Sequence, residues 1–345
     1  MFKTELEIYD QYAALSQTLE YMKSQAEPIR AVLRDHVFDS VVFTGCGSSL
    51  SLCRSAALST QLRLQWPASA LASGDLAINA GWYASLLQSA LVIAPSRSGS
   101  TTEVLQAVEQ ARALGRPVVA VTAKAGSPLE AMADLTLTLP WAFDNSVCQT
   151  RTVTNLYAAN LLLIALWAED EALVADIEAM AAAGPAYMDQ VAPVAQAIAG
   201  EPWTNVVVLA DGEVSGIAQE GSLAFVEICQ VPGVFHHVLD VRHGPMVLVN
   251  ASTLVIAACS QAEPPWQEKL IQDLRAQGAR VVSVSPEPAR SWGADWEIVT
   301  PSVQSWAVFG IPFIFVPQAV ALEKAKANGV NPDEPAGLDP FIDLS

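Results

Sequence analysis

The chain repeats itself at a long and nearly constant spacing. Leu91-Val92-Ile93-Ala94 recurs as Leu254-Val255-Ile256-Ala257, and the segment Gly115 to Val121 has a counterpart in Gly278 to Val284, both at an offset of 163 residues. These runs are rich in β-branched residues and are bounded by Gly, Pro and Ser, which is typical of buried parallel strands. A period of this length predicts two copies of a domain and not a solenoid.

Further matches extend the repeat. Val41-Val42-Phe43 parallels Val206-Val207-Val208 at an offset of 165, and the stretches 104–114 and 268–277 are both amphipathic with a helical period. Strand–helix–strand units of this kind form α/β domains with helices against a mainly parallel sheet. The sequence therefore predicts two such domains in tandem.

The length of 345 residues fits two medium domains. The expected organisation is an N-terminal helical segment (1–36), a first domain (37–140), a helical connection (141–200), a second domain (201–320) and a C-terminal helix end with a tail (321–345). Prolines in Asn331-Pro332-Asp333-Glu334-Pro335 predict that the tail packs as an extended strap.

Composition excludes several classes of partner. Hydrophobic residues make up 52% and charged residues 16%, and the net charge of −18 opposes binding to nucleic acid and to anionic membranes. The most apolar helical stretch, Leu161 to Trp167, stops at Glu169, so we expect no membrane span. Met1 to Glu5 does not begin a signal peptide, and five scattered cysteines indicate reduced thiols, hence a cytoplasmic location.

Two segments of the first copy each join an apolar strand to a turn rich in Ser and Gly and then to a helix. The turns are Gly45-Cys46-Gly47-Ser48-Ser49 and Ser96-Arg97-Ser98-Gly99-Ser100-Thr101. Free backbone N–H groups, hydroxyls and the positive end of a helix then meet at one point, which suits a phosphate. Two such turns in one domain predict a ligand held from two sides.

The second copy differs at the corresponding places. It has Ala210-Asp211-Gly212-Glu213 and Cys259-Ser260-Gln261-Ala262, where acidic and larger residues suit an anion poorly. We therefore expect the first domain to bind the phosphate and the second to supply a different function.

These residues resemble the tandem branch of the SIS (sugar isomerase) family, in particular the isomerase half of glucosamine-6-phosphate synthase. Besides the two turns, the segment Glu220 to Ile228 is similar to that family's helix with a catalytic glutamate, and Arg242-His243-Gly244-Pro245 is similar to its histidine-bearing turn. The resemblance covers about Val41 to Gly337. It implies an α/β fold of two tandem SIS domains, each a mainly parallel sheet flanked by helices.

The resemblance also implies roles for single residues. Glu227 is the implied proton-transfer residue, and His243 is the implied ring-opening residue, reaching in from the partner subunit of a homodimer. The implied substrate-binding residues hold a sugar phosphate and include a loop like Asn145 to Thr150; they are Gly47, Ser48, Ser49, Ser96, Ser98, Thr101, Val147 and Gln149, with Arg97 as a cation beside the second turn.

The chemistry is consistent with these roles. Aldose–ketose isomerisation moves a proton between C1 and C2 and needs a base whose pKa is near neutral. A carboxyl in an apolar helix such as Leu223 to Ile228 has its pKa raised by desolvation, and a histidine suits acid–base work at the ring oxygen. No metal and no cofactor are required.

Differences from the synthase reduce the number of reactions that the resemblance allows. The chain starts with a helix where the synthase has a glutaminase domain, and Gly337 to Ser345 contains no lysine for a Schiff base. We therefore expect no glutamine-dependent amination. Isomerisation, deamination of an amino sugar phosphate, and cleavage of a sugar–amino-acid adduct remain open. Arg97 replaces a glutamine of the synthase and is a hypothetical partner for a second anionic group, such as the carboxylate of an adduct.

Simpler interpretations stand beside these. A Ser/Gly turn is often only a helix N-cap, Glu227 could be a solvated surface residue, and His243 could cap a turn. Glu220 is either structural or a second acid. His236 and His237 are adjacent on a strand and point to opposite sides, which disfavours a shared metal. The main alternative function is a non-catalytic sensor of sugar phosphates; a dinucleotide-binding oxidoreductase is disfavoured because no GxGxxG follows either first strand.

Overall fold

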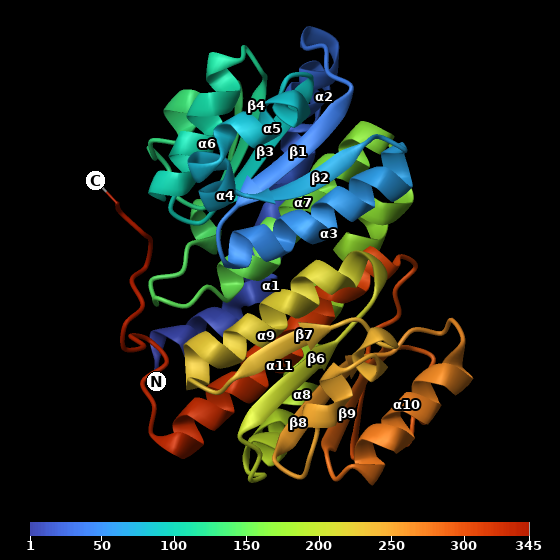
Figure 1. Ribbon diagram of the computed structural model, residues 1–345. Coiled ribbons are helices and arrows are strands. Elements are labelled where there is room, and N and C mark those ends of the chain that lie inside the picture. The colour runs from blue at the N-terminus through green and yellow to red at the C-terminus, as the bar shows by residue number, and fades with distance from the viewer. Residues whose placement is uncertain (345) are drawn as a thin grey trace.

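The first half of the chain folds around a five-stranded sheet. The structure is a computed structural model that describes residues 1–344, and Figure 1 shows this sheet in its upper half. The strands lie in the order β2-β1-β3-β4-β5 and all pair in parallel; they are β1 (Ser40–Gly45), β2 (Ala68–Ala72), β3 (Ala90–Ser96), β4 (Val118–Thr122) and β5 (Leu135–Thr138).

The second half contains a sheet of the same design. Its order is β10-β9-β8-β6-β7, again parallel throughout; the strands are β6 (Asn205–Leu209), β7 (Gly233–His236), β8 (Thr253–Ala258), β9 (Arg280–Pro286) and β10 (Trp296–Thr300). In both sheets the first strand lies between the second and the third. The chain order reverses there, and ligands of open parallel sheets bind beside that point at the carboxyl ends of the strands. The predicted fold class is confirmed.

Helices cover both faces of each sheet. Those of the first sheet are α3 (Ser48–Leu64), α4 (Ser73–Ile78), α5 (Ala80–Leu87) and α6 (Thr102–Ala113), and those of the second are α9 (Ser215–Cys229) and α10 (Pro264–Ala276). Longer helices join the two halves: α1 (Lys3–Ser24), α7 (Arg151–Ala168), α8 (Glu171–Ala199) and α11 (Trp306–Asn328), whereas the short α2 (Ala26–Asp35) packs on α7 and β5 of the first half. Short 3₁₀ turns complete the chain: η1 (Glu130–Met132), η2 (Pro140–Ala142), η3 (Gly212–Val214), η4 (Asp240–Arg242) and η5 (Pro245–Leu248).

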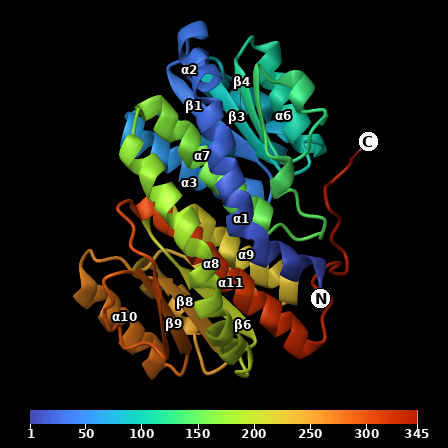
Figure 2. The ribbon, with the colours of Figure 1, turned by 180° about the vertical axis from the view of Figure 1, so that it is seen from behind.

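The long helices form the layer between the sheets. Helix α11 packs on α8 and α9, and α1 packs on α7 and α8, as the view from behind shows (Figure 2). Among the described helices, α11 alone is long and apolar enough to cross a membrane, but 89% of its most apolar window is buried inside the protein. This burial identifies α11 as a core helix.

Helix α9 of the second half lies tightly against α3 of the first half. A Cβ at Gly216 would lie 2.3 Å from the carbonyl oxygen of Ser51, so only glycine permits this approach. The backbone N–H of Ile217 donates to Ser55 Oγ at 3.1 Å, and Ser59 donates to the buried carboxylate of Glu213 at 2.7 Å. These contacts hold a helix of the second sheet beside the first sheet's opening helix.

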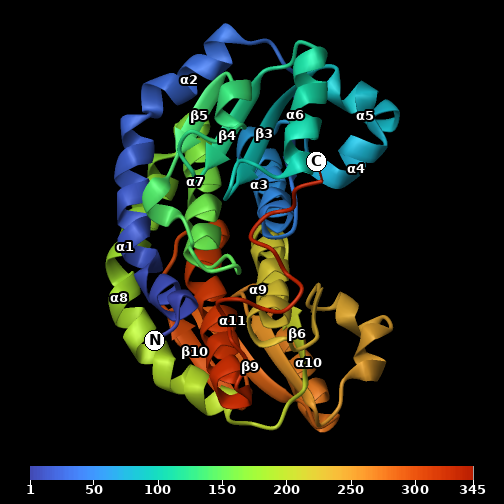
Figure 3. The same cartoon turned by 90° about the vertical axis from the view of Figure 1, so that its left-hand side faces the viewer.

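The tail follows neither helix nor strand, as its prolines predict. Asp333 accepts hydrogen bonds from the backbone N–H groups of Lys3 (2.9 Å) and Thr4 (2.8 Å) at the start of α1. The segment then crosses from the second half to the first and ends beside α6, where the Thr102 N–H donates to the carbonyl of Ile342 at 3.2 Å (Figure 3).

Candidate active site

The two Ser/Gly turns lie side by side. They leave β1 and β3, which are hydrogen-bonded neighbours, at the carboxyl edge where the strand order reverses. Between them is a small cavity of about 30 Å³. Its lining residues are Cys46, Ser49, Ser96, Arg97, Ser98, Thr101, Val104, Gln149 and Pro340. Most of these residues belong to the predicted substrate-binding set.

Hydrogen bonds to its own serine side chains stabilise the second turn. Ser96 Oγ accepts the Gly99 N–H at 3.0 Å, and Ser98 Oγ accepts the Ser100 N–H at 3.2 Å. Gly99 has a φ of +57°, and a Cβ there would lie 2.3 Å from Ser127 Oγ. The turn therefore has one compact conformation, which brings three hydroxyl side chains to the start of α6.

The helices α3 and α6 begin at this cavity. Neither helix has a side-chain hydrogen bond at its N-cap, Gly47 and Thr101 respectively, and the first N–H of α6 donates to the Ile342 carbonyl of the tail at 3.2 Å. The positive ends of both helix dipoles converge at this cavity. The arrangement favours an anion between them.

Arg97 is buried at the centre of the site. Its Nη1 donates to the carbonyls of Ser146 (3.1 Å) and Val147 (2.8 Å), and its Nη2 donates to the carbonyl of Pro340 in the tail. Burial lowers the pKa of the Arg97 guanidinium, whereas the nearby carboxylates of Asp144 and Glu227 raise it. We expected the guanidinium of Arg97 to bind a second anionic group of the substrate. In the structure its N–H groups instead bind the loop at Ser146 and Val147 and the tail at Pro340.

The loop after β5 adds an amide to the cavity. Gln149 lines it, and its Oε1 is buried without a hydrogen-bond partner among residues 1–344. Val147 has its N–H bonded to the carbonyl of Asp333 at 3.0 Å and its own carbonyl bonded to Arg97. Val147 therefore contributes its backbone N–H and carbonyl to the hydrogen bonds that hold this loop. Gln149 has a buried amide oxygen that is available to accept a hydrogen bond from a ligand.

Helix α9 brings two glutamates to the same place. Burial raises the pKa of Glu227 to about 7, and the positive charge of Arg97 opposes this rise. Burial raises the pKa of Glu220 well above its usual range; the charge of Glu227 adds to this, and a hydrogen bond from Ser48 counteracts it. The charge of Glu227 therefore interacts with Arg97 of the second turn, and Glu220 interacts with Ser48 of the first.

Comparison with known proteins agrees with this architecture. Residues 38–166 match the family model of the SIS domain. Residues 38–166 therefore form a SIS domain. The two sheets of the chain have the same strand order, and solved structures that cover nearly its whole length share the fold of both.

Two of these structures come from bacterial sugar-phosphate enzymes. Tagatose-6-phosphate ketose/aldose isomerase from Escherichia coli has a TM-score of 0.87 at 22% identity, covering 99% of this chain and 96% of that one. Glucosamine-6-phosphate deaminase from Thermotoga maritima has a TM-score of 0.81 at 23% identity, covering 99% of each chain. At these identities the likeness concerns the fold.

Relatives by sequence include two proteins from Shewanella. D-galactosamine-6-phosphate deaminase of Shewanella sp. (strain ANA-3) is 31% identical over 71% of this chain and 63% of its own length. Glutamine--fructose-6-phosphate aminotransferase of Shewanella oneidensis is 25% identical over 96% of this chain and 57% of its own. The chain spans about half the length of the curated aminotransferases that it matches.

The second half of the chain does not bring His243 to this site. His243 is exposed between η4 and η5, and within residues 1–344 its side chain has no hydrogen bond or ion pair with Glu227, Glu220 or Arg97. The neighbouring His237 bonds to Asp211 at 2.9 Å. Among those same residues, no group of three or more His, Cys, Asp or Glu side chains could hold a metal ion.

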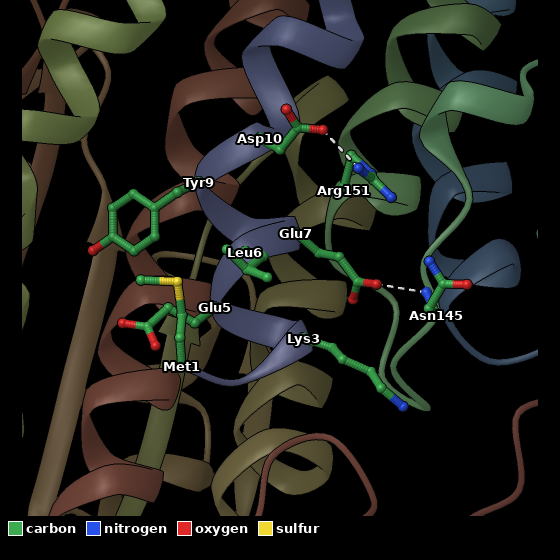
Figure 4. A pocket seen from close by; sticks show the side chains of 9 residues that line it. All are labelled: Met1, Lys3, Glu5, Leu6, Glu7, Tyr9, Asp10, Asn145 and Arg151. Atoms are coloured by element: carbon green, nitrogen blue, oxygen red, sulfur yellow. Dashed lines mark hydrogen bonds and ion pairs between the residues drawn. The ribbon is translucent and has the colours of Figure 1, made fainter.

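The sequence analysis missed the residues that hold the loop after β5. Glu7 of α1 is buried, and its carboxylate accepts the N–H groups of Asn145 (2.5 Å) and Ser146 (3.2 Å). Figure 4 shows Glu7 pointing at Asn145, and Asp10 paired with Arg151 at 2.6 Å, around a groove of about 560 Å³. In the sequence Glu7 looks like its charged neighbours on the same helix. Only the folded structure shows that Glu7 is buried and binds the loop.

Asp144 has a similar role at the end of this loop. It is buried and accepts the N–H groups of Thr150 (2.7 Å) and Thr152 (2.9 Å), which caps the start of α7. Burial, together with the charge of Glu7, raises the pKa of Asp144 to about 6. Glu7 and Asp144 therefore position the segment that carries Gln149 and that accepts the Arg97 hydrogen bonds.

Proposed function

We propose that this chain binds a sugar 6-phosphate at the two turns of its first SIS domain and moves a proton between C1 and C2 of the sugar with Glu227. The observation that carries the proposal is the environment of Glu227: burial raises the pKa of this carboxyl to about 7, and the charge of Arg97, in the second Ser/Gly turn, acts on it. A carboxylate of ordinary pKa would be too weak a base, and a base far from the turns would not reach the sugar.

The phosphate would be held by local groups. The protein's net charge of −18 repels a dianion, so the binding energy has to come from the hydroxyls of Ser49, Ser96, Ser98 and Thr101 and from the first N–H groups of α3 and α6. The cavity of about 30 Å³ is too small for a phosphate while Pro340 lines it. Substrate entry therefore requires the tail to move away from Arg97.

The proton transfer can be written in full. Ionised Glu227 removes the proton from C2 of the open-chain aldose, and the C–H electron pair forms the C1–C2 double bond of an enediol as O1 takes a proton. Loss of the O2 proton re-forms a carbonyl at C2, and Glu227 returns its proton to C1. The reaction is redox-neutral overall and leaves Glu227 ready for another cycle.

An amino sugar phosphate would use the same step. When nitrogen replaces the oxygen at C2, tautomerisation gives a C2 imine, which water hydrolyses to the ketose and ammonia. Burial and the charge of Glu227 both raise the pKa of Glu220 well above its usual range. We assign Glu227, whose pKa is about 7, as the carboxyl that exchanges the proton with the sugar. Deamination is our preferred reaction because the relative with 31% identity is named as a galactosamine-6-phosphate deaminase.

Ring opening needs a second acid–base group, which we assign to the partner subunit's His243 in a homodimer. The turn that carries this residue exposes two large apolar side chains, Val247 (83% exposed) and Leu248 (76% exposed). Burying them against a second copy would release water from apolar surface and deliver the imidazole to the neighbouring site. Five free thiols agree with action in the reducing cytoplasm.

A panel of substrates tests the proposed function. Purified protein would be incubated with fructose 6-phosphate, glucosamine 6-phosphate, galactosamine 6-phosphate and a fructosyl-amino-acid 6-phosphate, each followed by proton NMR in deuterated water. We expect deuterium at C1 or C2 of an amino sugar 6-phosphate, together with release of ammonia. Turnover of the adduct alone would identify a deglycase. Binding without exchange in every case would overturn the proposal in favour of a sensor.

A further inference from the structure

The second SIS domain has its own cavity where its strand order reverses. The cavity lies beyond the carboxyl ends of β6 and β8 and has a volume of about 440 Å³. Its lining residues are Asp211, Gly212, Val238, Leu239, Ala258, Ser260, Ala262, Glu263, Trp266, Gln267 and Trp306. A volume between about 300 and 1,000 Å³ is usual for small-molecule sites, so this cavity can hold a ligand of metabolite size.

The walls of the cavity are held in place by hydrogen bonds. Trp306 donates from Nε1 to the carbonyl of Asp211 at 2.9 Å, and its ring stacks on Phe309 with 4.5 Å between centroids. On the opposite wall the buried amide of Gln267 accepts the Ser260 N–H at 3.0 Å and donates to the carbonyl of Ala262 at 2.5 Å. Both walls are therefore formed before any ligand arrives.

This cavity lacks the backbone N–H groups at a helix start that would bind an anion. Helix α10 corresponds to α6 of the first domain, but its first two residues are Pro264 and Pro265, which have no N–H to donate. The residues at the start of α6 are Thr102 and Glu103, and both keep their N–H groups. The start of α10 therefore lacks two of the N–H donors that the start of α6 has.

The charges and rings of the cavity favour a cation instead. Of the described residues that line it, Asp211 and Glu263 are the charged ones, and neither a lysine nor an arginine is among them. Trp266 is 58% exposed, so its indole is open to a ligand. The faces of indole rings attract ammonium groups, and a carboxylate beside them strengthens this attraction.

We propose that this cavity binds a small organic cation, an amine or quaternary ammonium compound, between Trp266, Trp306 and the carboxylate of Asp211. The site is separate from the phosphate turns and does not depend on the function proposed above. It would make the chain responsive to a nitrogen-containing metabolite while the first domain handles the sugar phosphate.

The test uses ¹⁹F NMR of the protein labelled with 5-fluorotryptophan, with choline and unphosphorylated glucosamine as probes. We expect saturable shifts of the Trp266 and Trp306 resonances, assigned by single Trp→Phe variants, and no shift of Trp82, which is exposed in the first domain. N-acetylglucosamine, which lacks the charge, serves as the neutral control.

Two variants sharpen the result. Asp211→Asn keeps an acceptor for His237 but removes the charge, and we expect it to weaken choline binding about tenfold, as Trp266→Ala should. Trp82→Ala should leave binding unchanged. Equal binding of N-acetylglucosamine, competition by inorganic phosphate, or no saturation with either probe would overturn the proposal, whatever the outcome of the sugar-phosphate panel.

Discussion

Glu227 and Arg97 come from different domains, and each affects the charge state of the other. Burial raises the pKa of Glu227 to about 7, and the guanidinium of Arg97 limits that rise. A carboxyl with this pKa can accept a proton and return it at neutral pH, which an ordinary surface glutamate does poorly. In the proposed reaction, Glu227 acts on the reacting carbons of the sugar while Arg97 belongs to the turn that we expect to hold the phosphate.

The pH dependence of catalysis follows from this pair. The ionised form of Glu227 is the base, so kcat/KM should rise as the pH increases through about 7. Arg97→Gln removes the positive charge and should move the midpoint upward, whereas Arg34→Gln, in an exposed ion pair on α2, should not. The substrate phosphate titrates equally in all variants. An unchanged midpoint in Arg97→Gln would contradict the assignment.

The individual residues of the site were only partly predictable. Ser49, Ser96, Ser98 and Thr101 follow apolar strands, and that local pattern is enough to place them at one cavity. The carboxylate of Glu7 is different, because its contact with Ser146 joins positions that are 139 residues apart in the chain. No local pattern reveals a contact of that kind.

At the scale of elements, the turn after β3 determines the shape of the phosphate site. Gly99 and Gly126 both have positive φ angles, of +57° and +70°, so a Cβ strains the backbone at either position. A Cβ at Gly99 would also meet Ser127, whereas nothing lies within 4 Å of a Cβ at Gly126. Alanine substitutions at the two glycines can therefore be compared. Both introduce backbone strain, but only the one at Gly99 also introduces a steric collision.

Gly99→Ala should lower the free energy of unfolding more than Gly126→Ala does. Positive φ alone costs about 1 kcal/mol, and the collision with Ser127 should add a further 1–3 kcal/mol, roughly, as overpacking does. Urea unfolding of both variants measures the difference. Equal losses of stability would show that the turn tolerates the added methyl group and that its compact conformation is not required.

The tail is the element that covers the turns. The carbonyls of Pro340 and Ile342 accept hydrogen bonds from Arg97 and from the first N–H of α6, which are donors that a phosphate would use. Backbone carbonyls carry no sequence signature, so the repeat and the strand pattern predicted the α/β domains but could not predict this contact. We therefore expect the tail to compete with a phosphate for these donors.

Removing the residues after Leu338 should strengthen binding of inorganic phosphate by about tenfold, because charge-assisted hydrogen bonds to the tail no longer have to break. Isothermal titration calorimetry of the shortened and full chains measures this. Pro340→Ala keeps the backbone carbonyl and should behave like the parent chain. Weaker binding after truncation would mean that the tail contributes to the site.

At the scale of the whole molecule, the proposed site draws on both halves of the chain, which meet where α3 packs on α9, and we infer that it needs a second copy as well. Glu227→Gln and His243→Ala should each be inactive alone. If the two residues act in one site from different subunits, mixing the variants should restore about a quarter of the parent activity, since only some sites regain both groups. No restoration would place both residues in one subunit or deny His243 its role.

The central claim is that Glu227 moves the proton, and one measurement tests it most directly. Deuterium incorporation at C1 or C2 of the accepted sugar 6-phosphate would be compared in the parent chain, in Glu227→Gln and in Glu109→Gln, an exposed control on α6. We predict that Glu227→Gln still binds the sugar phosphate but loses at least about 100-fold in exchange rate, while Glu109→Gln keeps it. Undiminished exchange in Glu227→Gln would contradict the account.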